Sequence, residues 1–386
     1  MSKRVIIVGA GIGGATLAIA LIKQGFNVKL FEQAAALQEL GAGLTLPGSA
    51  MKIYDALGLW DKVRDICVRV GGIPHYHYKT GEFLSGVPDH DWTKKPNVTS
   101  QSGQTHRALL HGLLIETIMS LDPEALVTGH RLRRVEQGAD GVTAIFENGQ
   151  VARGDLLVGC DGIRSTTYQL MFGESRLKFT GVIALRFLVR ADLVREHLSK
   201  GRAANFIGPM RGLLRYGVRG GEVINAVALT KTDDWQGEGW SSPSSREELL
   251  HLFEDWHPDV VGLIEAAPPD GFYKWALFDR DPLTTWSSGR ITLLGDAAHP
   301  MLPYLGQGAT QAIGDAMMLS RALAAFENVD EALQCYETHR VEQVSKIVLE
   351  SRSRSELLNQ VDPYKYSGMN IKSVTDAGYD AVTMPL

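Results

Sequence analysis

The pattern of apolar and polar residues at the start of the chain predicts a strand, a tight turn, a helix and a second strand. Residues 5–8 are β-branched and apolar throughout, which is typical of a strand buried on both faces. Four glycines fall within residues 9–14, and the alanine-rich stretch 15–23 favours a helix that ends near Gly25. A second apolar run, residues 28–31, predicts the next strand.

Two later apolar strands each run into a dipeptide of glycine and aspartate. Residues 155–160 lead into Asp161-Gly162, and residues 290–294 lead into Gly295-Asp296. A glycine-containing loop and a helical run over residues 309–326 follow the second dipeptide. An acid at the end of a strand can accept a hydrogen bond from a ligand, and a glycine loop before a helix offers backbone donors.

The middle of the chain carries one further strand and one helix-start signal. Residues 213–218 are predicted to form a strand whose alternate side chains share one face. Ser244 and Glu247 precede an apolar run with the spacing of a capping box, which predicts a single helix over residues 246–265.

Composition narrows the class of protein. The net charge of −5, with 44% hydrophobic and 22% charged residues, is ordinary for a globular protein. The length of 386 residues indicates two or three domains, or one large composite unit. A slightly acidic chain gives no footprint for nucleic acid or an anionic membrane. Three cysteines without CxxC spacing disfavour a disulfide framework and a cysteine-rich zinc site. Glycines interrupt the apolar run at 5–22, which disfavours a signal peptide or a spanning helix, so we expect a cytoplasmic enzyme without a membrane anchor. We also expect no bound metal.

The glycine turn has the GxGxxG spacing of dinucleotide-binding proteins. Gly9 permits the sharp turn, Gly11 lets the backbone approach a pyrophosphate, and Gly14 lets the helix pack on the strand. A phosphate would sit at the N-terminus of the following helix, so Ile12 and Gly13 complete the candidate cofactor-binding turn.

Glu32 ends the second predicted strand, where an acidic side chain can hold ribose hydroxyls. The alternative is a glycine-rich turn that binds nothing. Strand, turn, helix, second strand and terminal acid all agree, which favours the dinucleotide site. The turn by itself does not distinguish FAD from NAD.

With these three motifs the chain resembles the single-component FAD-dependent aromatic hydroxylases, which are flavoprotein monooxygenases with a para-hydroxybenzoate-hydroxylase-like fold. In that family the GxGxxG turn binds the ADP part of FAD, and motifs matched by Asp161-Gly162 and Gly295-Asp296 contact FAD. Arg107 matches the arginine that steadies the flavin, and Gly306 and Gly308 lie in the loop that faces the ring. The chain looks most similar to the salicylate, 3-hydroxybenzoate and 6-hydroxynicotinate hydroxylases.

The resemblance implies an α/β fold with a Rossmann-like FAD-binding domain, an interleaved substrate-binding mixed β-sheet domain and C-terminal helices. The family's order of segments assigns residues 1–70, 100–178 and 282–326 to the FAD-binding domain, 71–99 and 179–281 to the substrate-binding sheet domain, and 327–386 to a C-terminal helical segment. A monomer or a homodimer is expected.

The activity implied by the resemblance is hydroxylation of a small aromatic or N-heteroaromatic acid. NADH or NADPH would reduce bound FAD, and a flavin hydroperoxide formed with O2 would transfer hydroxyl to the ring. Having one GxGxxG fits an enzyme that keeps FAD and meets NAD(P)H transiently. Two alternatives stay open: a tailoring oxygenase for a bulkier aromatic metabolite, and a flavin-binding protein without oxygenase activity.

Three side chains are candidates for the wall of the substrate site. Tyr216 matches a tyrosine that relatives place near substrate, and its alternative is an edge-strand tyrosine with a solvated hydroxyl. Arg186 can pair with a carboxylate or form a scaffold salt bridge, and Tyr304 neighbours the glycine loop. His75 and His77 share a strand face without a third ligand nearby, so packing or a substrate base is favoured over a metal site.

Four positions depart from the family's patterns. An arginine usually occupies the position of Tyr168, and Glu-Asp usually stands where this chain has Gly314 and Asp315. Several relatives have histidine at the position of Gly212, and hydroxylases of 6-hydroxynicotinate have histidine at the position of Thr45. The substrate base of those relatives therefore does not carry over to this chain.

Overall fold

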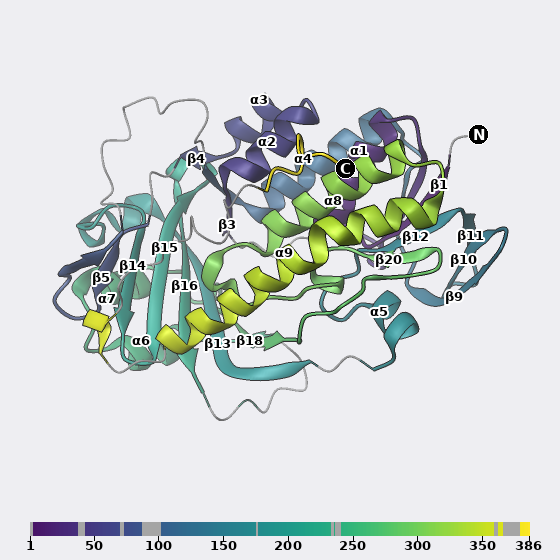
Figure 1. The fold of residues 1–386 in the computed structure, drawn as a ribbon. Helices are drawn as coiled ribbons and strands as arrows, with labels where there is room; N and C mark the ends of the chain where they lie inside the picture. Colours follow the sequence, from purple (N-terminus) through teal and green to yellow (C-terminus); the bar gives the residue numbers. More distant parts are fainter. Residues whose placement is uncertain are drawn as a thin grey trace.

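Two large β-sheets lie side by side in this protein, and one long helix crosses both (Figure 1). The structure is a computed structural model. It describes residues 3–37, 43–69, 73–86, 102–174, 177–232, 235, 241–358, 362–365 and 379–386.

The first sheet is built around the predicted N-terminal strand, which lies between two parallel neighbours. Its order is β19-β20-β12-β1-β2-β8, and every pair is parallel except that of the edge strand β19. The strands are β1 (Arg4–Val8), β2 (Asn27–Phe31), β8 (Leu126–Val127), β12 (Leu156–Gly159), β19 (Ser287–Ser288) and β20 (Ile291–Leu293). Because both faces are covered, the central strands β1 and β12 read as nearly continuous apolar runs.

Helices cover one face of this sheet and a small antiparallel sheet covers the other. Val5 and Ile7 pack into the helical layer, whereas Ile6 and Val8 pack against the small sheet. The helices are α1 (Ile12–Lys23), α2 (Gly48–Ala56), α3 (Trp60–Asp65), α4 (Arg107–Leu121) and α8 (Gly308–Ala325). The small sheet consists of β9 (Leu132–Gly138), β10 (Gly141–Phe146) and β11 (Val151–Gly154), and the short helix α5 (Thr166–Phe172) follows β12.

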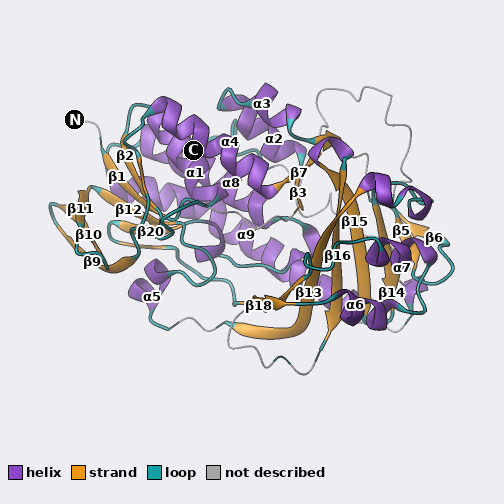
Figure 2. Cartoon of the chain, turned by 180° about the vertical axis from the view of Figure 1, so that it is seen from behind, coloured by secondary structure: helices purple, strands orange, loops and turns teal. Residues whose placement is uncertain are grey.

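The second sheet has eight strands in the order β17-β18-β13-β16-β15-β14-β5-β6, and all its pairs are antiparallel except β14 with β5. The strands are β5 (His75–His77), β6 (Phe83–Ser85), β13 (Lys178–Arg190), β14 (Ala204–Gly208), β15 (Arg211–Val218), β16 (Val223–Lys231), β17 (Ser241–Pro243) and β18 (Tyr273–Asp279). The helices α6 (Arg246–Phe253) and α7 (Pro258–Glu265) pack against this sheet (Figure 2). Arg215 of β15 and Asp259 of α7 form a buried ion pair, 2.8 Å between Nη2 and Oδ2, that links the sheet to α7.

The single helix expected over 246–265 is wrong, because α6 and α7 are separate helices with Pro258 at the start of the second. Proline lacks an N–H and fits the first turn of a helix far better than its interior. The N-cap of α6 is also one residue later than expected. Ser245 accepts from Glu248 N at 3.1 Å, and the hydroxyl of Ser244 donates to the Glu248 carboxylate at 2.8 Å.

A three-stranded sheet joins the two halves. It consists of β3 (Gly43–Leu46), β4 (Val68–Arg69) and β7 (Gly103–His106). Gly43 N donates to Asn225 Oδ1 of the second sheet at 2.9 Å. A Cβ at position 43 would lie 2.5 Å from the ring of Tyr216, so only glycine permits this close approach.

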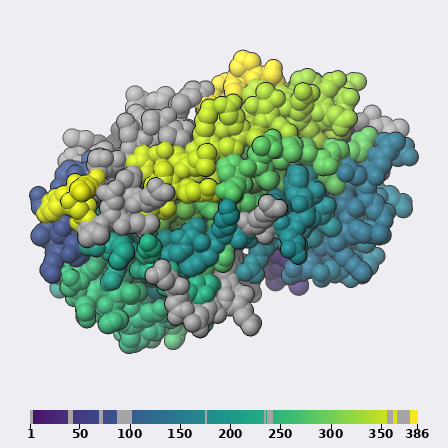
Figure 3. Space-filling model, turned by 60° about the horizontal axis from the view of Figure 1, so that its bottom comes forward, coloured from purple at the N-terminus to yellow at the C-terminus, as the bar shows by residue number. Residues whose placement is uncertain are grey.

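The long helix α9 (Val329–Leu358) packs on α8 and continues past the second sheet. Ser351 Oγ donates to Leu302 O at 2.6 Å, and Arg352 Nε donates to Asp279 Oδ2 at 2.7 Å. In the space-filling view this helix forms a yellow-green band along one side of the molecule (Figure 3). The long helix therefore contacts both the segment that follows the first sheet and the end of a strand of the second sheet.

The α/β fold class expected from the sequence is confirmed, with its parallel sheet, mixed second sheet and C-terminal helix. The exact domain boundaries stay a prediction. The remaining short elements are the 3₁₀ turns η2 (Ala191–Leu193), η3 (Arg195–His197), η4 (Arg219–Gly221), η5 (Gly295–Ala297), η6 (Pro303–Leu305) and η7 (Pro363–Lys365). None of the helices in the described part of the chain has the length and apolarity needed to span a bilayer.

Candidate functional site

One cavity of about 1430 Å³ lies between the first sheet and the open face of the second. Its volume exceeds the roughly 300–1,000 Å³ that is usual for one small ligand, so it has room for a cofactor and a substrate together. All of the site residues expected from the sequence line it: Gly9, Gly11, Ile12, Gly13, Gly14, Glu32, Arg107, Asp161, Arg186, Tyr216, Asp296, Tyr304, Gly306 and Gly308.

In the glycine turn between β1 and α1, three glycines are required for close packing, and the fourth borders open space in the cavity. Gly9 has φ +104°, and a Cβ there or at Gly14 would collide with backbone carbonyl oxygens. A Cβ at Gly13 would lie 2.7 Å from Leu294. Gly11 is different, since a Cβ there would meet no atom within 4 Å. The cavity thus has a backbone-walled recess at Gly11, at the N-terminus of α1, which fits a pyrophosphate.

Glu32 is oriented by the backbone at the end of β2. Its two carboxylate oxygens accept from Ala10 N at 3.0 Å and from Ala34 N at 2.9 Å. These bonds hold the carboxylate beside the glycine turn, where the remaining acceptor capacity faces the cavity. This placement fits an acceptor for ribose hydroxyls.

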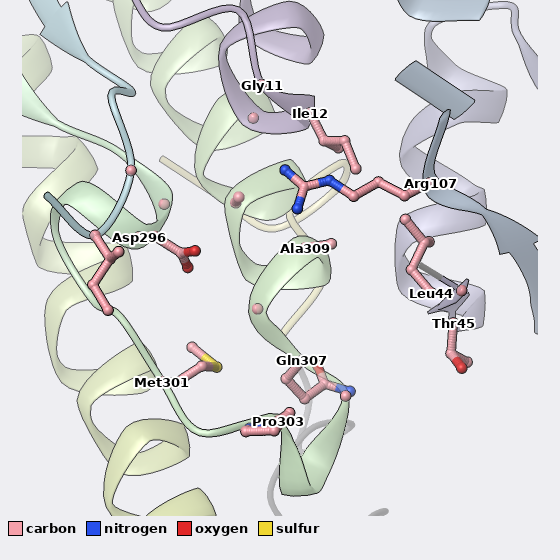
Figure 4. Close-up of a pocket in the computed structure, with 18 of the residues that line it drawn as sticks. Gly11, Ile12, Leu44, Thr45, Arg107, Asp296, Met301, Pro303, Gln307 and Ala309 are labelled. Atoms are coloured by element: carbon pink, nitrogen blue, oxygen red, sulfur yellow. The ribbon is translucent and has the colours of Figure 1, made fainter. Parts of the chain in front are cut away.

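Arg107 is the first residue of α4, and its side chain extends toward the Gly11–Ile12 turn and the start of α8 (Figure 4). One turn later, His111 Nε2 bonds to Ala10 O at 2.6 Å and holds α4 against the glycine turn. The guanidinium of Arg107 therefore lies between the glycine turn and the N-terminus of α8. A planar cation in that place can bind an electron-rich ring or an anion.

Asp161 uses its carboxylate locally rather than offering it to the cavity. It accepts from Ser165 Oγ at 2.5 Å, and from Thr167 N and Oγ1 at 2.9 and 3.1 Å. Burial raises its pKa above the ordinary value, although these hydrogen bonds oppose the rise. Its structural effect is to shape the loop before α5, and contact with a cofactor through its carboxylate stays a prediction.

Asp296 does offer its carboxylate to the cavity. Its side chain is exposed at the turn after β20, and a Cβ at Gly308 would lie 3.8 Å from Asp296 Oδ1. Gly306, with φ +62°, reverses the chain so that α8 begins at Gly308 with its N-terminus toward the cavity. Figure 4 shows Asp296 and Met301 on one side of this helix start and Thr45 on the other. The arrangement presents an acceptor and backbone donors together.

Beneath this turn lies a buried ionic network that the sequence did not suggest. Asp315 accepts from Gly295 N at 3.0 Å, His299 Nε2 at 2.6 Å and Arg340 Nε at 2.7 Å. Gly314, which departs from the family's glutamate, leaves space for Arg340, since a Cβ there would lie 3.3 Å from Arg340 Nη2. His299 is thus a structural residue of the turn.

Tyr168, where the family usually has arginine, is covered by an arginine from elsewhere in the chain. The guanidinium carbon of Arg280, the residue after β18, lies 3.7 Å from the centroid of the Tyr168 ring. Arg280 Nη2 also donates to Ala297 O at 2.6 Å. This cation–π contact ties α5 to the turn that carries Asp296.

The substrate-wall candidates lie on the opposite side of the cavity. Tyr216 is buried on an inner strand, so the expectation of a solvated edge tyrosine does not describe it, and burial raises its pKa to about 12. Arg186 packs its guanidinium 5.5 Å from the Trp275 ring, and no salt bridge to it occurs among the described residues. Burial lowers the pKa of Arg186. Tyr304 is buried between the glycine loop and the second sheet, next to Gly212.

His75 and His77 lie on the same strand β5, and both are buried. His77 Nδ1 bonds to the Thr80 hydroxyl at 3.2 Å, and its ring stacks on Tyr364 at 5.0 Å. Of these two histidines, only His75 lines the cavity. Within the ranges that the structure describes, no three His, Cys, Asp or Glu side chains are grouped to hold a metal.

Comparison with known proteins gives one consistent picture. The family model described as FAD binding domain matches residues 2–351. The chain is 33% identical over 381 residues to 6-hydroxynicotinate 3-monooxygenase of Pseudomonas fluorescens, covering 97% of this chain and 96% of that protein. It is 33% identical over 350 residues to 3-hydroxybenzoate 6-hydroxylase of Polaromonas naphthalenivorans, covering 90% and 86%. A substrate complex of salicylate hydroxylase matches with a TM-score of 0.78 at 25% identity, covering 97% and 93%.

The recess at Gly11 predicts that Gly11→Ala weakens cofactor binding without weakening the fold. The added methyl meets no protein atom but occupies the space next to the helix N-terminus. We expect the Kd for FAD, measured by quenching of flavin fluorescence, to rise at least tenfold, or about 1.4 kcal/mol. Gly14→Ala is the matched control for packing, and it should lower the denaturant midpoint. Unchanged FAD affinity in Gly11→Ala would place the pyrophosphate elsewhere.

The buried network predicts that Asp315→Asn destabilises the protein by about 3–5 kcal/mol, because it leaves the Arg340 cation uncompensated. Burial raises the pKa of Asp315, but His299 and Arg340 lower it further, so the net pKa lies below its ordinary value. The stabilisation is therefore complete above the unfolded-state pKa of about 3.9 and is lost as pH falls through the folded-state value. Urea unfolding between pH 3 and pH 7 measures both effects.

The control for this variant is Glu342→Gln, which alters an exposed ion pair with Lys346 on α9 and should leave the unfolding midpoint unchanged. A loss in Asp315→Asn no larger than that of the control would show that the network does not support the fold.

Proposed function

The chain belongs to the FAD binding domain family and is an FAD-dependent aromatic hydroxylase, and on that premise we propose that it hydroxylates a small aromatic or N-heteroaromatic acid with NADH or NADPH and O2. The two curated relatives described above are named for the hydroxylation of a hydroxypyridine acid and a hydroxybenzoic acid. NAD(P)H supplies two electrons and a proton, a second proton comes from solvent, one oxygen atom enters the ring as hydroxyl and the other leaves as water.

The observation that carries this proposal is the continuous cavity that joins the dinucleotide turn to the open face of the second sheet. FAD, when bound and reduced by NAD(P)H, would supply the activation of O2, and the residues of this chain would bind and orient the cofactor and the substrate. In the proposed arrangement the N–H groups at Gly11 and Ile12 receive the pyrophosphate, Glu32 receives a ribose hydroxyl, and Arg107 and the N-terminus of α8 hold the flavin ring.

On the substrate side, Arg186 is proposed to bind the acid group. Its guanidinium stays cationic although burial lowers its pKa, since arginine titrates far above neutral pH. Tyr216 is proposed to hydrogen-bond a ring hydroxyl or ring nitrogen. With a pKa of about 12 it is neutral at pH 7, so it acts as a hydrogen-bonding group and not as a phenolate base.

A bulkier aromatic metabolite is the second candidate substrate, and the space at Gly212 and Thr45 favours it. Both positions line the cavity, and both carry small residues. A Cβ at Gly212 would meet nothing nearer than Phe206 O at 3.4 Å and Asn205 Oδ1 at 3.9 Å. The cavity is therefore wider at the place where several relatives carry a histidine.

The test is to load the protein with FAD and follow NADH and NADPH oxidation in air across hydroxybenzoates, hydroxypyridine carboxylates and larger fused-ring phenols. Oxidation that one compound stimulates, with a hydroxylated product recovered, is the expected result. Flavin that no nicotinamide cofactor bleaches, with any ligand present, would instead indicate a flavin-binding protein without oxygenase activity.

Replacing the proposed carboxylate anchor should separate acid recognition from turnover. We expect Arg186→Met to raise KM for the acid substrate by tenfold or more, because a charge-assisted pair contributes about 1.5–3 kcal/mol. The KM for the corresponding carboxamide should change little. Arg190→Met is the control, because Arg190 lies on the same strand with its side chain exposed and paired to Asp192. An equal rise for acid and carboxamide would remove Arg186 from the anchor role.

A further inference from the structure

The cavity face of the second sheet carries one cross-strand row that is polar at its ends and apolar in its middle. Arg186 pairs with Val227, Val227 with Leu214, Leu214 with Asn205, and Asn205 with His75. All five residues line the cavity. Directly paired residues point to the same face of a sheet, so a flat ring over Val227 and Leu214 has Arg186 at one end and Asn205 at the other.

The oxygen of the Asn205 side chain reaches toward Gly212 on the neighbouring strand β15, beside this row. Asn205 Oδ1 lies 3.9 Å from the position that a Cβ on Gly212 would occupy, one strand closer to Arg186 (Figure 2 shows β14 and β15 side by side). The space that a larger residue would fill at position 212 is thus bordered by a hydrogen-bond acceptor. A ligand that enters this space meets Asn205 Oδ1 directly.

His75 fixes the orientation of this amide. Asn205 Nδ2 lies 3.3 Å from His75 Nδ1, and because an amide nitrogen only donates, His75 Nδ1 is the acceptor. The ring of His75 is buried, and burial lowers its pKa to about 4, so it is neutral at pH 7 with its proton on Nε2. Nδ2 is therefore directed to His75 and Oδ1 to the cavity. No donor among the described residues bonds to Oδ1.

The length of the row limits how the polar groups of a ligand are spaced. Three strand spacings separate β13 from β14, which is about 14 Å at about 4.8 Å each. A ligand that contacts both residues must therefore carry its two polar groups at opposite ends, and a fused second ring covers more of this length than a single ring does.

We propose that Asn205, positioned by His75, determines substrate specificity by accepting a hydrogen bond from an O–H or ring N–H at the end of the substrate distal to its acid. This inference rests on the proposed function and names the substrate class more closely. The substrate is an aromatic or heteroaromatic acid whose donor lies para to the acid or on a fused second ring. His75 touches the substrate only through Asn205 and is a positioning residue.

The test measures binding by calorimetry on the FAD-loaded protein, so that it does not depend on turnover. Two ligand pairs are compared, 4-hydroxybenzoate with benzoate and 6-hydroxy-2-naphthoate with 2-naphthoate. The wild-type protein should bind the hydroxylated member of at least one pair tenfold or more tightly, and the pair that shows this distinguishes a para donor from a fused-ring donor. Asn205→Leu should lose that preference while its affinity for the unhydroxylated acid stays the same.

Two variants of His75 test the positioning role. His75→Leu should reduce the preference, and His75→Gln, which keeps an acceptor beside Asn205, should restore it. The His75 pair decides the question if Asn205→Leu does not fold.

Three results would overturn the inference. The first is a preference for the hydroxylated ligand that persists in Asn205→Leu. The second is an equal loss of that preference in His75→Leu and His75→Gln. The third is equal affinity of the wild-type protein for both members of each pair. Acids that bind without preference leave the proposed function intact. An FAD-loaded protein that binds no aromatic acid overturns both.

Discussion

A buried carboxylate that is matched by a buried guanidinium determines the geometry of the cofactor end of this protein. Asp315 and Arg340 are both fully buried, and such charges are tolerated only when every polar atom has a partner. Here the partners are the backbone of the Gly295 turn, His299 and the Gln311 side chain. The turn that presents Asp296 is therefore held in place by helices α8 and α9. The C-terminal segment joins the same assembly, with the Tyr379 ring 4.7 Å from the Arg340 guanidinium carbon.

Contacts between residues that are distant in sequence also hold the two large sheets together. Gly43 brings β3 against Tyr216, and Asn225 accepts the hydrogen bond of its backbone. On the other side, α9 is bonded to Leu302 near the glycine loop and to Asp279 at the end of β18. Close packing and hydrogen bonds thus set the separation of the cofactor and substrate walls from two directions. A cavity bounded in this way can position two ligands without a large rearrangement of the sheets.

The sequence predicted what is encoded locally. The turn at 9–14 and the strands on either side follow from glycine spacing and apolar runs, because strand, turn and helix contact one another within about 30 residues. The α/β class and the two GD and DG turns followed from the same logic, with the family resemblance joining them. The alternation in β15 likewise placed Tyr216 in a strand.

What the sequence did not reveal depends on contacts between distant segments. Arg280 covers Tyr168 from 112 positions away, and His75 pairs with Asn205 across 130 positions. No period or motif encodes such pairings, because they arise only when the sheet order is set. Asp161 was placed correctly at its strand end, yet its carboxylate serves the α5 loop, since nearby hydroxyl and amide donors compete for it. Pro258 did carry a local signal for the break between α6 and α7, which the capping pattern upstream obscured.

The two backbone bonds to Glu32 have a consequence for discrimination among nucleotides. If the adenosine ribose binds beside Glu32, as proposed above, this carboxylate is fixed in place and cannot swing away from a second negative charge. The adenosine ribose of FAD carries free hydroxyls, whereas that of NADPH carries a 2′-phosphate, which Glu32 would repel at close range in a partly desolvated site. Under that proposal, the charge of Glu32 would disfavour binding of the 2′-phosphorylated reductant in the FAD site. NADPH, if it is the electron donor, must approach the flavin by a route that avoids this carboxylate.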